Sequence, residues 1–294
     1  MTTIPQLSRL GLGTGRLASL GSRLSRSEAA LLIHTALDHG IRVIDTADAY
    51  GSGDSERAIG VALKGRPRED YILITKAGLA HVALPAALSP LNQVGKKLLQ
   101  FTSVGKNFSK SYLVRCAQLS LRRLATNYVD AFLLHSPTTG EPTTESWEAL
   151  KEIRNQGLSR LTGVSTGDPE VVRQGILSGQ VSIVETPITL TAPHAEEIGR
   201  LCALHDVELV ANECLKPRGI LLERAAVWDQ MRSRHGVKEV STILLLIAYA
   251  SAHQGVSSVI IGSKSPEHLV ENIQALYYRE NMRGLFEEMK ETFR

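Results

Sequence analysis

The sequence predicts an α/β protein, and a single closed (β/α)8 barrel, the TIM-barrel architecture, fits it best. Short and nearly continuous apolar runs recur along the 294 residues, which is typical of strands buried on both faces of a parallel sheet. Segments with helical spacing separate these runs, and several of them begin at Ser or Thr and end at Gly. A chain of about 250 residues or more that alternates strand and helix in this way has the usual size of an eight-stranded barrel.

The expected strands resemble one another closely in character. Each is a short apolar run, such as RVIDTA, YILITKA or SVIIGS, without the regular polar alternation of a half-exposed strand. This pattern indicates that helices cover the sheet on its outer face while side chains fill its interior. In chain order the expected strands are 9–14, 42–47, 71–77, 130–136, 160–165, 182–187, 208–215 and 258–263.

Helical periodicity is clearest in some of the connecting segments. SEAALLIHTALDHG begins with Ser and ends with Gly, and TESWEALKEIRNQG begins with Thr and ends with Gly, as capped helices commonly do. A doubly wound sheet is the competing architecture, but GLGTG and GSGDSE both lack its Gly-x-Gly-x-x-Gly spacing and context. No linker or low-complexity segment divides the chain, so we expect one domain over residues 1–294. The helices expected with most support are 27–40, 55–65, 112–125 and 144–157.

Composition and charge exclude several classes of protein. Hydrophobic residues make up 43% of the chain and charged residues 21%, an ordinary balance for a globular protein in water. The net charge of +3 is spread along the chain, so we expect neither a nucleic-acid nor a membrane partner. The longest apolar run, ILLLIAYA, is too short to span a bilayer, and the N-terminus lacks a signal-peptide core. Three cysteines without metal-ligand spacing indicate free thiols, a cytoplasmic location and no bound metal.

Polar side chains of unusual character end three neighbouring predicted strands. Asp45, Lys76 and His135 lie at the ends of the second, third and fourth strands, and Tyr50 follows five residues after the Asp. Each has an ordinary alternative role: a turn cap, a solubilising strand end, a core histidine or a packed loop tyrosine. Because the carboxyl ends of barrel strands open onto one face, however, these four residues should lie together. Their convergence predicts a single active site.

The four side chains form a group suited to proton transfer. A tyrosine hydroxyl has a pKa near 10, and a nearby ammonium such as Lys76 should lower it and ease proton donation. Asp45 can pair with Lys76, while His135 can hydrogen-bond a substrate oxygen or relay a proton to Tyr50. Such a group would polarise a carbonyl and protonate its oxygen. A hydride must then come from elsewhere, and a nicotinamide cofactor is its natural source.

Several blocks of the chain, in order, resemble the aldo-keto reductases. They include GLGT, GIRVIDTADAYG, ITK, SLRRLATNYVDAFLLHSP, GLSRLTGVS and IIGSKSPEHLVEN, which together extend over essentially the whole sequence. The resemblance implies a catalytic tetrad of Asp45, Tyr50, Lys76 and His135. It also implies NADP(H) as hydride carrier, with Tyr50 as general acid in reduction and general base in oxidation of a small carbonyl or sugar-like substrate. Neither the substrate itself nor the choice between a monomer and a small homo-oligomer follows from the sequence.

The resemblance extends to the adenosine end of the cofactor. Ser263 and Lys264 fall where the family holds the adenosine 2′-phosphate, and the helix start that follows them is an anion site in its own right. Lys264 favours NADPH over NADH, whereas His268 stands where many members carry Arg and weakens that preference. The alternative is an ordinary capped helix with a charged face. The other contacts implied along the cofactor are Gly13, Thr14, Asp45, Leu215, Gly219, Gly262, Glu271 and Asn272.

The nicotinamide end departs from the family pattern. The Ser-Asn pair that holds the carboxamide reads Ser165-Thr166, the usual Gln of the sixth strand is Glu185, and the stacking Tyr of the seventh is Asn212. Thr166 offers a hydroxyl in place of an amide, and an ionised Glu185 cannot donate a hydrogen bond. These changes leave a second hypothesis open: a cofactor-binding regulatory or scaffold protein of the same fold with negligible turnover.

The segment 79–110 is longer than the family's usual connection after the third strand. Counted from His81 it carries five basic residues and no acidic one, and it follows directly on the Lys76 strand. A long loop at the active face predicts a lid or a substrate wall, which would favour acidic or polyhydroxylated substrates. The alternative is a surface insertion that packs as a helix beside the barrel, since LNQVGKKLLQF has helical spacing.

Overall fold

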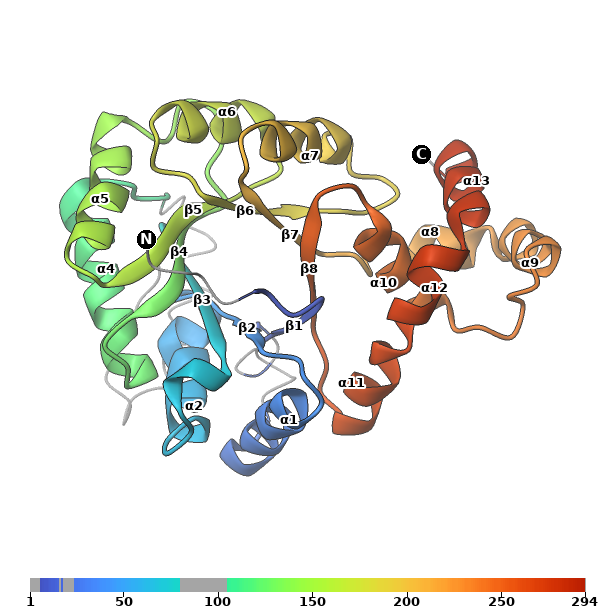
Figure 1. The fold of residues 1–294 in the computed structure, drawn as a ribbon, viewed down its shortest axis with the longest axis horizontal. Coiled ribbons are helices and arrows are strands. Elements are labelled where there is room, and N and C mark those ends of the chain that lie inside the picture. The colour runs from blue at the N-terminus through green and yellow to red at the C-terminus, as the bar shows by residue number, and fades with distance from the viewer. Residues whose placement is uncertain (1–5, 16, 18–23, 80–104, 294) are drawn as a thin grey trace.

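Eight parallel strands close into a barrel in a computed structural model of the chain, which describes residues 6–15, 17, 24–79 and 105–293 (Figure 1). Each strand pairs with its neighbours in sequence, and β8 returns to pair with β1. The predicted (β/α)8 fold is therefore confirmed. The strands are β1 Leu10–Gly13, β2 Val43–Asp45, β3 Ile72–Ala77, β4 Val129–His135, β5 Ser159–Ser165, β6 Ile183–Pro187, β7 Glu208–Asn212 and β8 Val256–Ile261.

Two strands end earlier than the sequence predicts. The predicted strand 42–47 stops at Asp45, because the backbone beyond it turns and Asp48 N–H donates to the carbonyl of Lys76 over 3.0 Å. The predicted strand 208–215 stops at Asn212, because Glu213 adopts the left-handed conformation with φ of 57°. In both cases the shorter strand releases its polar residues into the loops above the barrel.

Helices surround the barrel, and two of them are capped slightly earlier than the sequence suggests, at Ser25 instead of Ser27 and at Thr143 instead of Thr144. Ser25 and Glu28 form a reciprocal capping box at the start of α1, and Asp168, Ser241 and Ser265 cap later helices. The helices are α1 Arg26–Asp38, α2 Asp54–Ala62, α4 Lys110–Leu124, α5 Thr144–Asn155, α6 Pro169–Leu177, α7 Ala195–Leu204, α8 Arg218–Glu223, α9 Ala225–Arg234, α10 Thr242–Ala252, α11 Pro266–Ile273, α12 Ala275–Asn281 and α13 Arg283–Phe293, with short 3-10 turns η1 Tyr50–Gly53 and η2 Arg68–Asp70.

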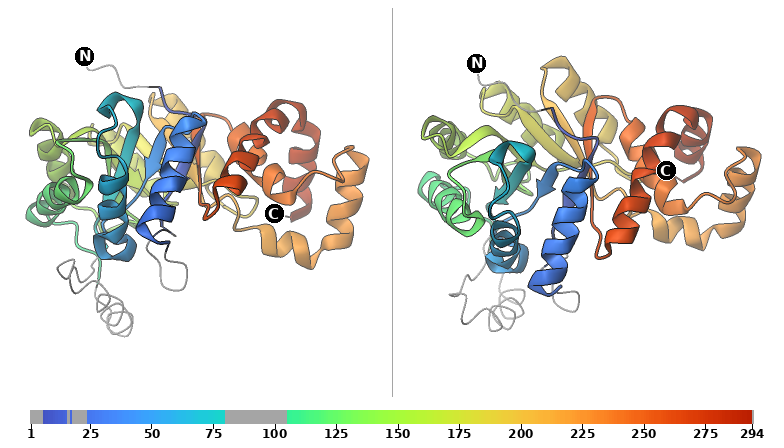
Figure 2. Two further views of the ribbon diagram at one scale, coloured as in Figure 1. Left: turned by 90° about the horizontal axis from the view of Figure 1, so that it is seen from below. Right: turned by 60° about the horizontal axis from the view of Figure 1, so that its bottom comes forward.

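The helices near the C-terminus extend the molecule to one side. Both views in Figure 2 show the orange and red helices α8, α9, α12 and α13 gathered beside the barrel. Aromatic contacts join them: the Trp228 and Phe293 rings meet edge to face at 6.3 Å, as do Tyr249 and Phe286 at 5.8 Å. These contacts hold α9 against α13 and α10 against α13.

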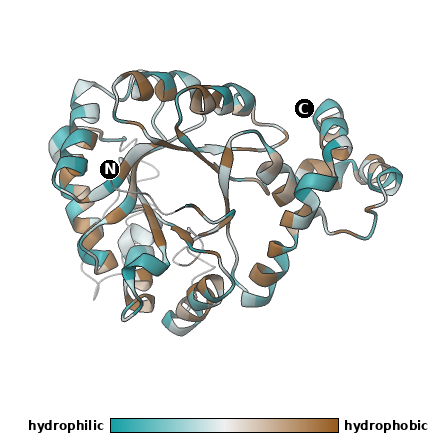
Figure 3. Ribbon diagram, in the orientation of Figure 1, coloured by the Kyte–Doolittle hydropathy of each residue, from teal (hydrophilic) through white to brown (hydrophobic). Residues whose placement is uncertain are grey.

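Apolar side chains fill the barrel and the layer around it. Figure 3 shows the strands mainly in brown or white, whereas the surrounding helices carry teal as well. Gly163 on β5 is required by close approach, because a Cβ atom there would lie 1.8 Å from the carbonyl oxygen of Ile183 on β6. The barrel interior contains Val43, Ile72, Ile74, Ala131, Leu133, Leu161, Ile183, Val210 and Ile260.

The most apolar segment lies inside the protein. Residues 243–250 belong to α10, and most of their side chains are buried. Within the described ranges, no helix combines the length and the apolar character that crossing a bilayer requires. The three cysteines, Cys116, Cys202 and Cys214, are buried and free of disulfide bonds.

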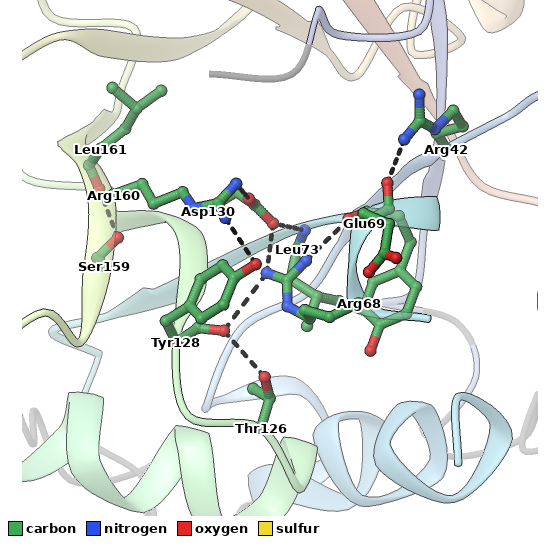
Figure 4. Close-up of polar contacts among 11 residues, drawn as sticks. Arg42, Arg68, Glu69, Leu73, Thr126, Tyr128, Asp130, Ser159, Arg160 and Leu161 are labelled. Carbon is green, nitrogen blue, oxygen red and sulfur yellow. Dashed lines mark hydrogen bonds and ion pairs between the residues drawn. The ribbon is translucent and has the colours of Figure 1, made fainter. Parts of the chain in front are cut away.

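A polar network lies at the amino-terminal ends of β3, β4 and β5 (Figure 4). The buried carboxylate of Asp130 on β4 accepts hydrogen bonds from Arg68 at 2.5 Å, from the backbone of Leu73 at 2.9 Å and from Arg160 at 3.3 Å. The guanidinium carbons of Arg68 and Arg160 lie 4.1 and 4.3 Å from the ring centroid of Tyr128. This end of a barrel ordinarily contributes stability rather than catalysis.

Candidate active site

The four predicted catalytic residues meet at the carboxyl-terminal mouth of the barrel. Asp45 ends β2, Lys76 lies one residue before the end of β3, and His135 ends β4. The ammonium of Lys76 donates a short hydrogen bond to Asp45 and a second to the carbonyl of Thr46 at 3.1 Å. The ring of Tyr50, in η1, lies 5.5 Å from that ammonium and meets the His135 ring edge to face at 5.8 Å. The structure thus brings together all four residues that the sequence singled out.

A fifth side chain, Glu185 of β6, joins this group. One carboxylate oxygen lies 3.2 Å from the Lys76 nitrogen, and the other accepts hydrogen bonds from Asn212 at 2.6 Å and Ser165 at 3.2 Å. The side chains of Lys76, Asp45 and Glu185 are at most 4% exposed. One buried ammonium therefore faces two buried carboxylates. A polar residue at the end of the apolar run IVETP was the sequence signal for this position, but the sequence did not show its partner.

Burial and mutual charge shift the pKa values of these groups. Burial, followed by the charge of Glu185, raises the pKa of Asp45 well above its usual value, against the opposing effect of Lys76. Burial is the largest influence on Lys76 and lowers its pKa, but the charges of Asp45 and Glu185 outweigh it and raise that pKa. The ammonium therefore stays protonated throughout the physiological range.

Tyr50 differs from the sequence prediction in the direction of its pKa. Lys76 is the largest single influence and lowers the pKa, as predicted. Burial and the charges of Asp45, Glu185 and Glu213 together outweigh it and raise the pKa of Tyr50 to about 12. The prediction of a lowered pKa is wrong, because it counted one cation and omitted burial and the excess of carboxylates.

Thr166 and Thr14 use their hydroxyls within the protein. The Thr166 hydroxyl donates to the carbonyl of Pro137 at 2.7 Å and accepts from the backbone of Asp168 at 3.1 Å. The Thr14 hydroxyl donates to the carbonyl of Asp45 at 2.8 Å. Both side chains are buried and brace the loops at the mouth, so neither hydroxyl can donate to a cofactor unless its present hydrogen bond breaks.

A cavity of about 620 Å³ opens beside the nicotinamide-end residues, within the usual size range of small-molecule sites. It lies at the carboxyl ends of β4 to β7, above the Glu185 group. Polar side chains from several loops approach it, and its lining includes Ser136, Thr138, Ser165, Thr166, Asp168, His194, Asn212 and Glu213.

The predicted adenosine-end residues surround the start of α11. Ser263 is buried and its hydroxyl donates to the carbonyl of Ser265 at 2.8 Å, which shapes the turn that leads into the helix. The Ser265 hydroxyl caps the helix by accepting from the backbone of His268 at 3.3 Å. Of the remaining predicted contacts, Asn272 is buried, Gly13 and Leu215 are partly buried, and the exposed ones are Gly219, Gly262, Lys264, His268 and Glu271.

The segment 79–110 is described only at its two ends. Leu79 and Lys106 form an isolated antiparallel bridge, and the Lys106 ammonium pairs with Glu141 at 2.8 Å. Lys110 begins α4. The rest of this segment, with His81, Lys96 and Lys97, lies outside the described residues, so its role as a lid or as a helical insertion stays a prediction.

A buried acid close to Tyr50, Asp48, was not among the residues predicted from the sequence. Asp48 is fully buried in the turn between β2 and η1, and burial, followed by the charge of Glu56, raises its pKa to about 8. Its position within DTADAYG, between the Asp and the Tyr, was the available signal. Elsewhere, among residues whose placement is described, no three His, Cys, Asp or Glu side chains gather to hold a metal ion.

The fold and this site define an α/β-barrel protein with a buried acid–base group at its carboxyl face. The family model described as Aldo/keto reductase family matches residues 9–283, so the chain belongs to that family. The resemblance seen in the sequence is thereby confirmed.

Individual relatives match over nearly their full lengths. An uncharacterized oxidoreductase, YqkF, from Bacillus subtilis is 29% identical, covering 96% of this chain and 90% of its own. An NADH-specific methylglyoxal reductase from Escherichia coli is 26% identical, covering 94% and 91%. Among solved structures, the holo form of aldo-keto reductase AKR11C1 from Bacillus halodurans superposes with a TM-score of 0.74 at 26% identity, covering 95% and 92%. An aldo/keto reductase from Klebsiella pneumoniae in complex with NADP and acetate gives 0.74 at 25%, covering 97% and 92%.

Proposed function

We propose that the protein is a nicotinamide-dependent oxidoreductase that reduces an aldehyde or ketone to an alcohol, or catalyses the reverse, with NADP(H). The observation that carries this proposal is the convergence of Tyr50, Lys76, Asp45 and His135 at one barrel mouth. The edge-to-face contact of Tyr50 with His135, and the ammonium 5.5 Å from the centre of the Tyr50 ring, support this proposal because they place a cation and an imidazole beside the phenol. Family membership supports the same reaction class.

In the proposed mechanism the protein supplies the proton and orients the carbonyl. Bound NADPH would supply a hydride to the carbonyl carbon. Tyr50 donates its phenolic proton to the carbonyl oxygen, and Lys76 beneath the ring stabilises the resulting phenolate. His135, edge-on to Tyr50, hydrogen-bonds the same oxygen. In the oxidation direction the Tyr50 phenolate takes the proton from the alcohol.

The described residues fit a dinucleotide along the mouth. The capped start of α11, with Ser263 and the exposed Lys264 beside it, can hold the 2′-phosphate of NADP(H), and Glu271 and Asn272 lie farther along the same helix near the proposed adenine position. Ser165 and Asn212 border the 620 Å³ cavity where the carboxamide would lie. One relative is named as NADH-specific and another is bound to NADP, so the relatives alone do not decide between the two cofactors. The proposal of NADP(H) therefore rests on Lys264, whose charge can pair with the 2′-phosphate.

The proposed substrate is a small carbonyl compound or a sugar-like one. The cavity lining includes the polar side chains of Asp168, His194 and Glu213, which can hydrogen-bond a hydroxyl-bearing substrate. A cytoplasmic location, and a monomer or a small homo-oligomer, complete the proposal.

The experiment that tests this function replaces Tyr50 with Phe. Turnover is followed as loss of reduced-nicotinamide absorbance over a panel of aldehydes, ketones and sugars, and cofactor affinity by NADPH fluorescence. Tyr50→Phe removes the proton donor and keeps the ring, so kcat should fall by about 10²- to 10⁴-fold while NADPH affinity stays within about twofold. Activity retained in this variant would overturn the mechanism.

The second candidate function is a cofactor-binding regulatory or scaffold protein. It is favoured by one observation: Glu185, Ser165 and Asn212, which the family would direct to the nicotinamide, bond one another. NADPH binding by the wild-type protein without turnover of any carbonyl in the panel would select this candidate.

A further inference from the structure

Lys76 reaches across the barrel mouth between two carboxylates. Asp45 approaches it from β2 on one side, and Glu185 approaches it from β6 on the far side at 3.2 Å. All three side chains are withdrawn from water, so solvent does not screen their charges. A single ammonium cannot neutralise two carboxylates, and the group carries excess negative charge unless a proton is retained.

Glu185 is fixed in this position by neighbours on both sides. Asn212 of β7 and Ser165 of β5 donate to the same oxygen, at 2.6 and 3.2 Å, which leaves the other oxygen directed toward Lys76. Burying a carboxylate is costly unless it is paired and hydrogen-bonded. Three adjacent strands, β5, β6 and β7, therefore fix this carboxyl group opposite Lys76.

The charged groups around Tyr50 determine how easily its phenol ionises. The charged and titratable groups that face it are Lys76 from β3, Asp45 from β2, His135 from β4, Glu185 from β6 and Glu213 from the loop after β7. Lys76 stabilises a phenolate at Tyr50, and each carboxylate opposes it. Glu185 disfavours the Tyr50 phenolate directly by charge repulsion. It also pairs with the Lys76 ammonium, which would otherwise stabilise the phenolate.

We propose that Glu185 is a second counter-ion of Lys76 and a positioning residue that keeps Tyr50 in its protonated form. This inference rests on the proposed function for its catalytic meaning, although the electrostatic effect exists without turnover. The consequence is directional. The Tyr50 phenol, which donates the proton in carbonyl reduction, stays protonated at every physiological pH. Alcohol oxidation needs the phenolate and is therefore confined to alkaline conditions.

The test is Glu185→Gln, which removes one charge while an amide oxygen can still accept from Asn212 and Ser165. A unit charge within several Å at an effective dielectric constant of about 20 should move the Tyr50 ionisation by about one to two pH units toward neutrality. The readout is the ring-carbon NMR signal of isotope-labelled tyrosine, with Tyr50→Phe used to assign the Tyr50 resonance. Where turnover is measurable, the alkaline limb of the oxidation rate should move by the same amount.

The matched control is Glu213→Gln, which makes the same change of charge at the same end of the barrel. Glu213 is exposed and pairs with Lys216, so water should screen it and the Tyr50 ionisation should move by less than about 0.3 units. A Tyr50 titration unchanged in Glu185→Gln, or moved equally by both variants, would overturn the inference. A shifted titration in a protein without turnover would instead support the inference and remove the proposed function.

Discussion

A cluster of three charges lies at each end of the barrel strands, and the two clusters have opposite composition. At the amino end one carboxylate, Asp130, serves two guanidiniums, Arg68 and Arg160. At the carboxyl end one ammonium, Lys76, serves two carboxylates, Asp45 and Glu185. The amino-end cations are 18% and 31% exposed, whereas all three carboxyl-end side chains are at most 4% exposed. Water can therefore screen the excess positive charge at the amino end, whereas the excess negative charge at the carboxyl end is shielded from water.

This difference in exposure and charge balance suits the amino-end cluster to a structural role and the carboxyl-end cluster to proton transfer. At the amino end the Asp130 carboxylate receives hydrogen bonds from both guanidiniums and a backbone amide, and Tyr128 lies against both cations. Each charged group of this cluster has a partner of opposite charge. At the carboxyl end the unbalanced charge shifts the pKa of Asp45 and Tyr50, which is the property that a proton-transfer site uses.

The largest effect on folding should come from Asp130→Asn, which breaks the amino-end cluster. The change leaves two cations around a neutral amide, so the free energy of unfolding should fall by about 3 kcal/mol, the lower range for a broken buried pair. Urea denaturation measures this loss, and kcat of the folded fraction should be unchanged. A loss of kcat without a loss of stability would show that the two ends are not separate in function.

A second prediction concerns the pH dependence of the two reaction directions, which tests the raised pKa of Tyr50 at the carboxyl end. Alcohol oxidation needs the Tyr50 phenolate, and a pKa of about 12 leaves little of it at neutral pH. Below that pKa the phenolate fraction rises about tenfold per pH unit, so the oxidation rate should climb with the same slope. Reduction needs the phenol and should lack this rise. Rate profiles in both directions decide the point, and an oxidation plateau near pH 8 would contradict the raised pKa.

The sequence predicted the carboxyl end better than the amino end. Asp45, Lys76 and His135 could be identified because each interrupts an apolar run at the end of a predicted strand, where barrel topology gathers side chains. Glu185 showed the same pattern, but its contact with Lys76 depends on how far β6 stands from β3 across the mouth. The curvature of the barrel sets the distance between β3 and β6. No local sequence pattern reveals that distance.

The amino-end cluster gave no sequence signal at all. Arg68, Asp130 and Arg160 lie near strand starts, where polar residues are ordinary, and they meet because β3, β4 and β5 are adjacent. The direction of the Tyr50 pKa was missed for a related reason. The prediction counted the one cation visible in the motif, whereas the outcome depends on the sum of burial and three carboxylates from separate strands and loops.

The smallest predicted effect concerns a second lysine at the carboxyl face. Lys264 is exposed, unlike Lys76, so its charge acts through screened attraction for a 2′-phosphate and not through a fixed buried contact. Lys264→Ala should weaken NADPH binding about tenfold, close to 1.4 kcal/mol, and leave NADH binding nearly unchanged. Lys216→Ala, which removes an exposed lysine after β7, is the control and should affect both cofactors alike. Fluorescence titrations at two salt concentrations give the measurement: the NADPH preference should shrink as salt rises, and equal losses of both cofactors would remove the phosphate role from Lys264.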